Sequence, residues 1–190
     1  MDKNRLESFS DGVLAIIITI MVLQLGVPNS SEMTALYPVI PVFLGYVLSF
    51  IYVGIYWNNH HHLLKTLHQV SGSILWANLI LLFWISLFPF TTAWMAENHF
   101  TTWPTILYGI VLLMAAIAYN ILEKLIIKNE GEESELKQAV GKDRKGKISI
   151  LLYLIGIFTA FFWPHLSQIF YVIVAIIWLV PDRRIERILD

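Results

Sequence analysis

Long apolar stretches dominate this chain, and their lengths constrain its fold more than any other feature does. Four of them, roughly 12–28, 36–57, 74–96 and 103–122, meet or approach the about 20 residues that a helix needs to cross a bilayer. Of the 190 residues, 57% are hydrophobic and 14% are charged, whereas soluble domains are about 45–50% apolar and about 25% charged. The sequence therefore predicts an all-α integral membrane protein.

Two shorter apolar stretches, roughly 148–163 and 166–181, meet at Pro164–His165. Sixteen residues of helix reach only about 24 Å, which is less than the hydrocarbon thickness of about 30 Å. We interpret the pair as a helical hairpin whose outer turn is Pro164–His165. The expected architecture is a single domain, 1–190, with six transmembrane helices and a charged cytoplasmic linker at 123–147.

The basic residues predict the orientation of these spans. All 13 Lys and Arg residues fall on one side of the six-span arrangement, whereas the connections at 29–35, 97–102 and 164–165 contain none. Cytoplasmic connections carry an excess of Lys and Arg, so both termini are expected in the cytoplasm. Residues 1–28 have an acidic start and no small-residue cleavage site, which favours a mature helix over a signal peptide.

The first apolar helix follows a polar start, in the run "RLESFSDGVLAIIITIMVL" at 5–23. Within it Ile16, Ile20 and Leu23 have i, i+4, i+7 spacing, which places them on one helical face, and Thr19 shares that face. Two interpretations stay open from periodicity alone. The stripe can face lipid, with Thr19 bonding back to the carbonyl four residues earlier, or it can form a functional surface.

Asp11 precedes the apolar part of this helix by one residue. An ionisable group beside a membrane segment is costly unless it is paired or hydrated, and so it indicates a functional site. The structural alternative is that Ser10 or Asp11 lies in the first helical turn and caps free backbone N–H groups. Both interpretations stay open at this point.

Three segments resemble the transmembrane protein 175 family, the potassium channels of endolysosomes and their shorter bacterial and archaeal relatives. The family pattern Arg-x-x-x-Phe-Ser-Asp is matched by Arg5, Phe9, Ser10 and Asp11. The run "WNNHHHLL" resembles the end of the family's second helix, and "NLILLFWISLFPFTTAW" resembles its third. Together these matches cover about the first half of the chain.

The resemblance implies a homotetramer in which the first helix of each subunit lines a central pore. The implied pore-facing residues are Ile16, Thr19, Ile20 and Leu23. Four Ile16 side chains would form the narrowest ring, which gates by dewetting, and the Thr19 layer would favour potassium over sodium. No Thr-Val-Gly-Tyr-Gly filter is present, so we expect only a moderate preference for potassium over sodium. The expected location is a prokaryotic plasma membrane.

The resemblance also implies a polar network that holds the inner end of the pore helix, which we call the interlock. In the family, polar residues of the second and third helices hold the Phe-Ser-Asp motif. The residues assigned to the network here are Arg5, Phe9, Ser10, Asp11, Trp57, His60, His61 and Asn78.

Three consecutive histidines, His60, His61 and His62, raise the question of a metal site. Consecutive residues on a helix point about 100° apart, whereas helical metal sites use i, i+3 or i+4 spacing. We therefore expect no metal site and no cofactor. Membership of the interlock is favoured for these histidines, and a pH-sensing role stays open because histidine titrates near neutral pH.

The functions weighed against a potassium channel are an enzyme, a proton-coupled or other small-ion transporter, and a structural membrane protein. An enzyme is disfavoured because the chain shows no nucleophile–base pair, metal motif or phosphate loop. A transporter typically carries carboxylates near the membrane midplane, and no Asp or Glu lies deep in a predicted span. The expected partners are the lipid bilayer, potassium ions and other copies of the chain, with no nucleic acid.

Overall fold

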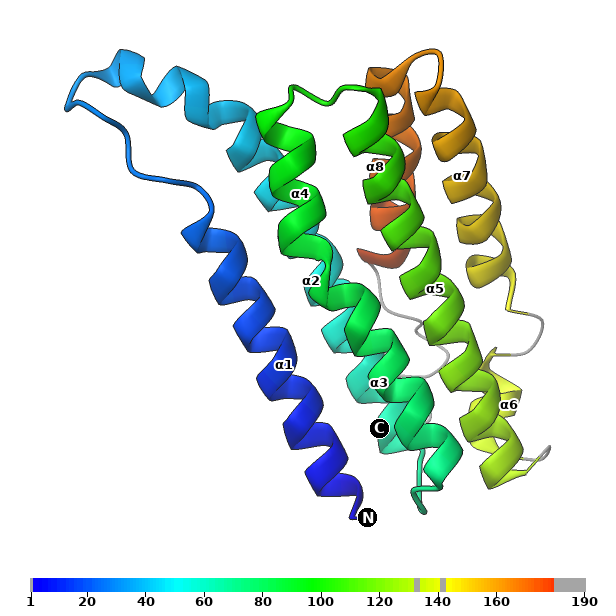
Figure 1. The fold of residues 1–190 in the computed structure, drawn as a ribbon. Helices are drawn as coiled ribbons and strands as arrows, with labels where there is room; N and C mark the ends of the chain where they lie inside the picture. The colour runs from blue at the N-terminus through cyan, green and yellow to red at the C-terminus, as the bar shows by residue number, and fades with distance from the viewer. Residues whose placement is uncertain (1, 132–133, 141–142, 180–190) are drawn as a thin grey trace.

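The computed structural model describes residues 2–131, 134–140 and 143–179, and within these ranges every regular element is helical. This confirms the all-α prediction. Figure 1 shows the long helices side by side, with α1 along one edge of the bundle and α7 and α8 toward the opposite edge. The elements are α1 (Lys3–Leu23), the 3₁₀-helix η1 (Met33–Val39), α2 (Ile40–Lys65), α3 (Gly72–Ser86), α4 (Phe88–Glu97), α5 (Thr102–Glu130), α6 (Glu135–Val140), α7 (Arg144–Ala160) and α8 (Pro164–Leu179).

Four helical segments of the described chain are long and apolar enough to cross a membrane, namely Lys3–Leu23, Met33–Lys65, Gly72–Glu97 and Thr102–Glu130. They correspond to the first four predicted spans. The shorter helix α8 is also apolar. The fifth predicted span is α7, whose first turn carries Arg144, Lys145 and Lys147 and therefore lowers its apolar character.

The first helix differs in its bounds from the predicted span 12–28. It begins at Lys3, where the Asp2 side chain caps it by accepting a hydrogen bond from the Asn4 backbone N–H at 3.3 Å. It ends at Leu23, and Gly26 follows in the left-handed region with φ of 67°. Glycine tolerates that conformation without steric cost, so the chain turns away from the helix axis before residue 28.

The third predicted span, 74–96, consists of two helices that meet at Leu87. Pro89 lies in the first turn of α4, where its missing N–H breaks the hydrogen-bond ladder of a continuous helix. The predicted linker 123–147 is also partly helical. Helix α5 continues to Glu130 because Leu122, Ile126 and Ile127 extend its buried face.

The core of the bundle is built where α5 meets α3, α7 and α8. Tyr171 of α8 is completely buried in this core. Its ring lies against Gly109 of α5 and Gly156 of α7, and a methyl group at either glycine would collide with it. Two glycines therefore set how closely three helices approach one another.

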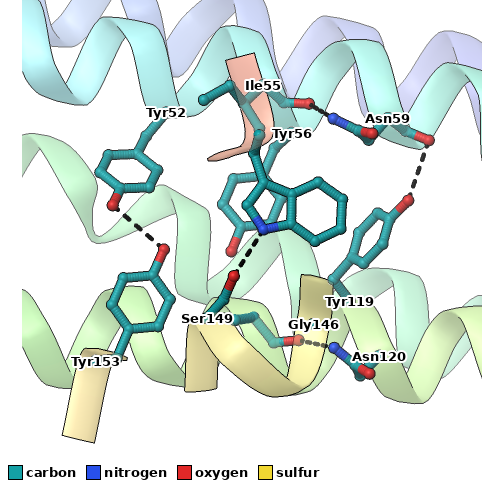
Figure 2. Close-up of a pocket in the computed structure, with 11 residues that line it drawn as sticks. Tyr52, Ile55, Tyr56, Asn59, Tyr119, Asn120, Gly146, Ser149 and Tyr153 are labelled. Atoms are coloured by element: carbon teal, nitrogen blue, oxygen red, sulfur yellow. Dashed lines mark hydrogen bonds between the residues drawn. The ribbon is translucent and has the colours of Figure 1, made fainter. Parts of the chain in front are cut away.

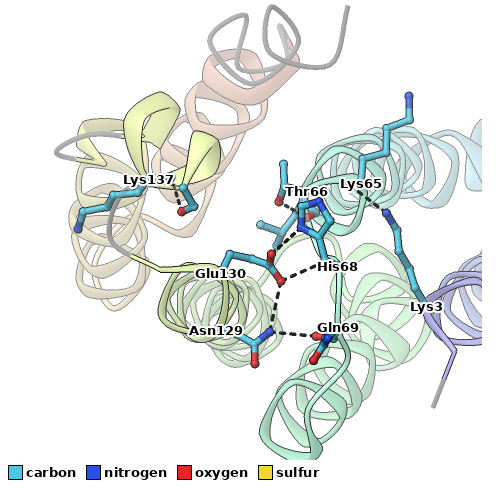
Figure 3. A network of polar contacts seen from close by, with 10 residues as sticks. Lys3, Lys65, Thr66, His68, Gln69, Asn129, Glu130 and Lys137 are labelled. Atoms are coloured by element: carbon cyan, nitrogen blue, oxygen red, sulfur yellow. Dashed lines mark hydrogen bonds and ion pairs between the residues drawn. The ribbon is translucent and has the colours of Figure 1, made fainter.

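The basic end of the bundle is tied together by polar contacts, which Figure 3 shows from close by. Lys3 Nζ donates to the Lys65 carbonyl at the end of α2, at 2.9 Å. The Glu130 carboxylate accepts from the His68 backbone N–H at 3.0 Å and from His68 Nδ1 at 2.6 Å. The turn between α2 and α3 is therefore clamped to the end of α5.

Glu130 lies beyond the membrane-spanning part of α5, because about 20 residues are enough to cross the hydrocarbon core and Glu130 is the last of 29. Burial raises the pKa of the Glu130 carboxyl, but hydrogen bonds from His68 and Asn129 outweigh it and hold the pKa below its ordinary value. The carboxylate form is therefore the one that makes the clamp.

Candidate functional site

Helix α1 has one buried and one exposed face within the subunit. The buried residues recur every three or four positions, as one stripe of a helix does, and are Leu6, Ser10, Leu14, Ile17 and Met21. The exposed face carries the predicted pore-facing set: Ile16 is 59% exposed, Ile20 43% and Leu23 75%. The structure therefore places all three on one side of α1, away from the rest of its own bundle.

Thr19 lies on the same exposed side of α1. Its hydroxyl donates to the Ala15 carbonyl four residues earlier, at 3.0 Å, which is the backbone bond expected of a threonine inside a helix. Because the hydroxyl hydrogen is directed to the backbone, the lone pairs of Oγ1 stay available as acceptors. An oxygen used in this way suits a cation better than an anion.

The buried half of the interlock is a chain of hydrogen bonds from α1 through α3 to α2. Ser10 Oγ donates to the Leu6 carbonyl at 2.9 Å and accepts from Asn78 Nδ2 at 2.9 Å. The other end of the Asn78 amide, Oδ1, lies 2.6 Å from His60 Nε2. Ser10, His60 and Asn78 are at most 2% exposed. Since an amide oxygen only accepts, Nε2 of His60 carries the proton.

The outer half of the interlock is a ladder of two contacts between α1 and α2. Trp57 Nε1 donates to Asp11 Oδ1 at 3.1 Å, and His61 Nδ1 contacts Glu7 Oε1 at 2.8 Å. Glu7 and Asp11 are four residues apart on α1, as are Trp57 and His61 on α2. The two helices therefore run antiparallel here, with one side-chain contact between them in each helical turn.

Glu7 was not among the residues predicted for the interlock. The signal that would have found it is its i, i+4 spacing to Asp11, since residues four apart share a helical face. The structure brings together Ser10, Asn78 and His60 in one chain, and Glu7, Asp11, Trp57 and His61 in the ladder.

Two other assigned residues, Arg5 and Phe9, do not join these contacts. Both are exposed, and Phe9 is 50% exposed. Within the described part of this single subunit, Arg5 makes no hydrogen bond or ion pair. Their assignment to the interlock therefore stays a prediction.

The alternative in which Ser10 or Asp11 caps the first helix is wrong. The cap is Asp2, so Ser10 and Asp11 lie more than one turn inside α1, where backbone N–H groups already bond within the helix. Their side chains are directed across helices instead. This is the finding that separates Asp11 from an ordinary helix-terminal carboxylate.

The consecutive histidines have separate surroundings. His60 contacts the Asn78 amide and His61 contacts Glu7, while the rings of His61 and His62 lie 5.8 Å apart. Among the described residues, no group of three His, Cys, Asp or Glu side chains is arranged to hold a metal ion.

Comparison with known proteins identifies the family of this chain. The family model described as endosomal/lysosomal potassium channel TMEM175 matches residues 5–89. A protein of Chryseobacterium sp. named a potassium channel is 59% identical over 187 residues, which cover 98% of this chain and 97% of that relative. The chain belongs to the TMEM175 family.

A solved TMEM175-family structure agrees with the fold. The crystal structure of a lysosomal potassium-selective channel TMEM175 homolog from Chamaesiphon minutus superposes with a TM-score of 0.83 at 27% identity, covering 95% of this chain and 97% of that one. The zebrafish relative, named an endosomal/lysosomal proton channel TMEM175, is 24% identical over 194 residues. That match covers 94% of this chain and 36% of the zebrafish protein.

TMEM175 family membership has two direct consequences. The chain is an integral membrane protein, in agreement with its four apolar helical segments of membrane-crossing length. The matched family and relatives are ion channels and not enzymes, which confirms that the chain is not an enzyme.

Proposed function

We propose that this chain is the subunit of a potassium-permeable cation channel with a moderate preference for potassium over sodium. The names of the Chryseobacterium relative and of the Chamaesiphon structure support the potassium assignment. The single observation that carries the proposal is the exposed stripe of α1, where Ile16, Thr19, Ile20 and Leu23 face away from their own subunit.

A homotetramer accounts for that exposed stripe. One helix cannot enclose a pore, and α1 lies along an edge of the bundle (Figure 1). Four copies arranged around an axis next to α1 would turn the four stripes toward one another. Closed rotational symmetry is the usual arrangement of identical subunits. The tetramer therefore supplies for the outer face of α1 the neighbours that the single subunit lacks.

The gate follows from the chemistry of this stripe. A ring of four Ile16 side chains is apolar, and a narrow apolar constriction stops ions by losing its water. The neighbouring Thr19 oxygens, whose hydrogens bond to Ala15 carbonyls, would replace part of the water that a cation sheds. Replacement by single hydroxyls is weaker than a cage of carbonyls, which is why we propose moderate selectivity.

The orientation is part of the same proposal. Lys3, Lys65 and Lys137 lie at one end of the bundle (Figure 3), the end that we assign to the cytoplasm by the distribution of basic residues. Both termini would be cytoplasmic. The bacterial relatives support a prokaryotic plasma membrane as the location.

The experiment is a flux assay on purified protein in liposomes, with potassium or sodium as the permeant ion. We expect passive potassium flux that exceeds sodium flux in the unmodified protein. Ile16→Asn should raise flux several-fold because a polar ring stays hydrated, and Thr19→Ala should reduce the potassium-to-sodium ratio. Absence of flux from all three proteins, with assembly verified by size-exclusion chromatography, would contradict the channel proposal.

Proton permeation is a second candidate, favoured by the name of the zebrafish relative as a proton channel. A pH-sensitive dye inside the same liposomes measures it. Proton entry that follows a pH gradient without potassium would support a proton-permeable pore. Proton movement in fixed proportion to a second ion would instead support the proton-coupled transporter.

A further inference from the structure

A small cavity lies on the side of α2 that faces away from α1. It lies between α2, α5, α7 and α8 and is partly open, with a volume of about 30 Å³ and a lining mainly of aromatic and amide side chains. Figure 2 shows Tyr56, Asn59, Asn120 and Ser149 around it. The cavity is separate from the interlock, which uses the side of α2 that faces α1 and α3.

Tyr56 is a lining residue whose hydroxyl has no hydrogen-bond partner among the described residues. The residue is 8% exposed, and no described residue forms a hydrogen bond with its hydroxyl. Its neighbours differ: the Tyr153 hydroxyl donates to the Tyr52 hydroxyl at 3.3 Å, and the Tyr119 hydroxyl donates to a backbone carbonyl at 3.2 Å. A hydroxyl that is shielded from water and has no partner is costly, so we infer that a water molecule in the cavity serves as the partner of Tyr56.

Two amide oxygens are further acceptors among the lining residues. Asn59 Nδ2 donates to the Ile55 carbonyl at 2.8 Å, and Asn120 Nδ2 donates to the Ala116 carbonyl at 3.2 Å. Each amide thereby uses its nitrogen on its own helix. No hydrogen bond reaches either Oδ1 atom within the described chain, and both residues line the cavity. The cavity therefore combines one hydroxyl with two acceptors.

The size and charge of the cavity identify the ligand. A volume of about 30 Å³ accommodates one or two water molecules, since one water needs about 10–15 Å³. A hydrocarbon chain is excluded by this size and would leave the polar groups unpaired. A cation is disfavoured because the Lys145 ammonium already lies 5.6 Å from the ring centre of Trp178, a lining residue.

We propose that this cavity is a water-binding site in which one or two molecules form hydrogen bonds with the Tyr56 hydroxyl and with other polar groups of the lining. Helix α2 has polar residues on two sides, one in the interlock and one at the cavity. The water supplies hydrogen bonds for the residues at the cavity. Gly146 and Ser149 of the lining belong to the first turns of α7, so the site lies toward the basic end of the bundle.

The first test is the thermal stability of Tyr56→Phe in detergent. If water bridges the hydroxyl, the substitution removes a hydrogen bond and lowers the melting temperature by a few degrees, about 2–4 °C for a chain of this size. If the cavity is dry, the substitution removes an unpaired buried hydroxyl, and the melting temperature stays or rises. Tyr153→Phe, which removes the bond to Tyr52, calibrates the loss of one hydrogen bond in this core.

The second test is X-ray hydroxyl-radical footprinting of the unmodified protein, because radicals formed from bound water modify adjacent side chains. We expect Tyr56 to be modified several-fold faster than Tyr108, whose hydroxyl contacts Ser49 at 2.9 Å in the core. Equal rates for the two tyrosines, or an unchanged or raised melting temperature for Tyr56→Phe, would overturn the proposal. Neither readout depends on ion flux, so the test is independent of the proposed channel function.

Discussion

The two faces of α1 differ in what holds them. The inner face packs Leu6, Leu14 and Ile17 against the subunit and joins Ser10 to a buried hydrogen-bond chain. The outer face is equally apolar at Ile16 and Ile20, yet within the subunit these side chains stay exposed. Hydrophobicity alone therefore does not separate the faces; their neighbours do.

This difference teaches which substitutions report on folding and which report on function. A change on the inner face removes contacts that the subunit itself makes, so it should lower the free energy of unfolding. A change on the outer face leaves those inner-face contacts in place, and its main effect should be seen in the assembled protein. The predictions below use pairs of variants that separate the two faces.

The largest contrast is expected between Leu14→Asn and Ile16→Asn, two residues apart on opposite faces. Leu14 is 2% exposed, so an amide there loses apolar packing and lacks hydrogen-bond partners. The expected cost is about 3–5 kcal/mol, enough to abolish the monodisperse peak in size-exclusion chromatography. Ile16→Asn should keep that peak. Equal loss of folded protein for both variants would show that the subunit also depends on the outer face.

The next effect concerns the buried half of the interlock. Asn78→Leu removes the partner of Ser10 and of His60 together, and each stranded buried group costs about 1–3 kcal/mol. We expect a loss of about 2–4 kcal/mol, measured as a lower melting temperature in detergent. Thr19→Val is the control on the outer face and should change stability by no more than about 0.5 kcal/mol. A comparable drop in the melting temperature of Thr19→Val would contradict the distinction between the inner and outer faces of α1.

A smaller effect is expected at the ladder. Trp57→Phe removes the donor to Asp11, but Trp57 is 51% exposed, so water can replace the bond. The expected loss of stability is about 0.5–1 kcal/mol, smaller than for Asn78→Leu. Asp11→Asn and Ser10→Ala test the functional part of the interlock hypothesis. Assembly and flux at the unmodified level in both variants would contradict it.

The smallest effect is expected at the His68–Glu130 clamp, which involves neither face of α1. Because the folded-state pKa of Glu130 lies below its ordinary value, the clamp stabilises the protein above that ordinary value and is lost as the pH falls through the folded-state pKa. The stability difference between the unmodified protein and Glu130→Gln should be under about 1 kcal/mol. Melting curves from about pH 6 to about pH 3 span the carboxyl range. A difference that grows toward acid would contradict this sign.

Part of the interlock was predictable from the sequence because its residues match a family pattern. Ser10, Asp11, Trp57, His60, His61 and Asn78 were assigned in this way, and the structure brings them into two sets of contacts. Glu7 was missed because the pattern leaves its position open. The pairing of Asp11 with Trp57, and of Ser10 with Asn78, depends on the rotation of each helix, which a pattern of residue types does not specify.

Some of the helix bounds were likewise predictable from the sequence, and others were not. Apolar length predicted where the long helices lie, because backbone groups in lipid must bond within a helix. It did not predict the division at Leu87 or the continuation of α5 to Glu130. The division at Leu87 depends on Pro89 in the first turn of α4. The end of α5 depends on the burial of Ile126 and Ile127.

The sequence by itself determined that this chain is helical, belongs in a membrane and carries an apolar stripe with one threonine on its first helix. These properties follow from composition and period, which are local. Only the tertiary structure decided that the stripe faces outward, that Ser10 and Asp11 bond across helices, and that Tyr56 lines a small cavity. The reason is physical: exposure and pairing depend on how neighbouring helices are rotated and packed, and packing is a property of the whole bundle.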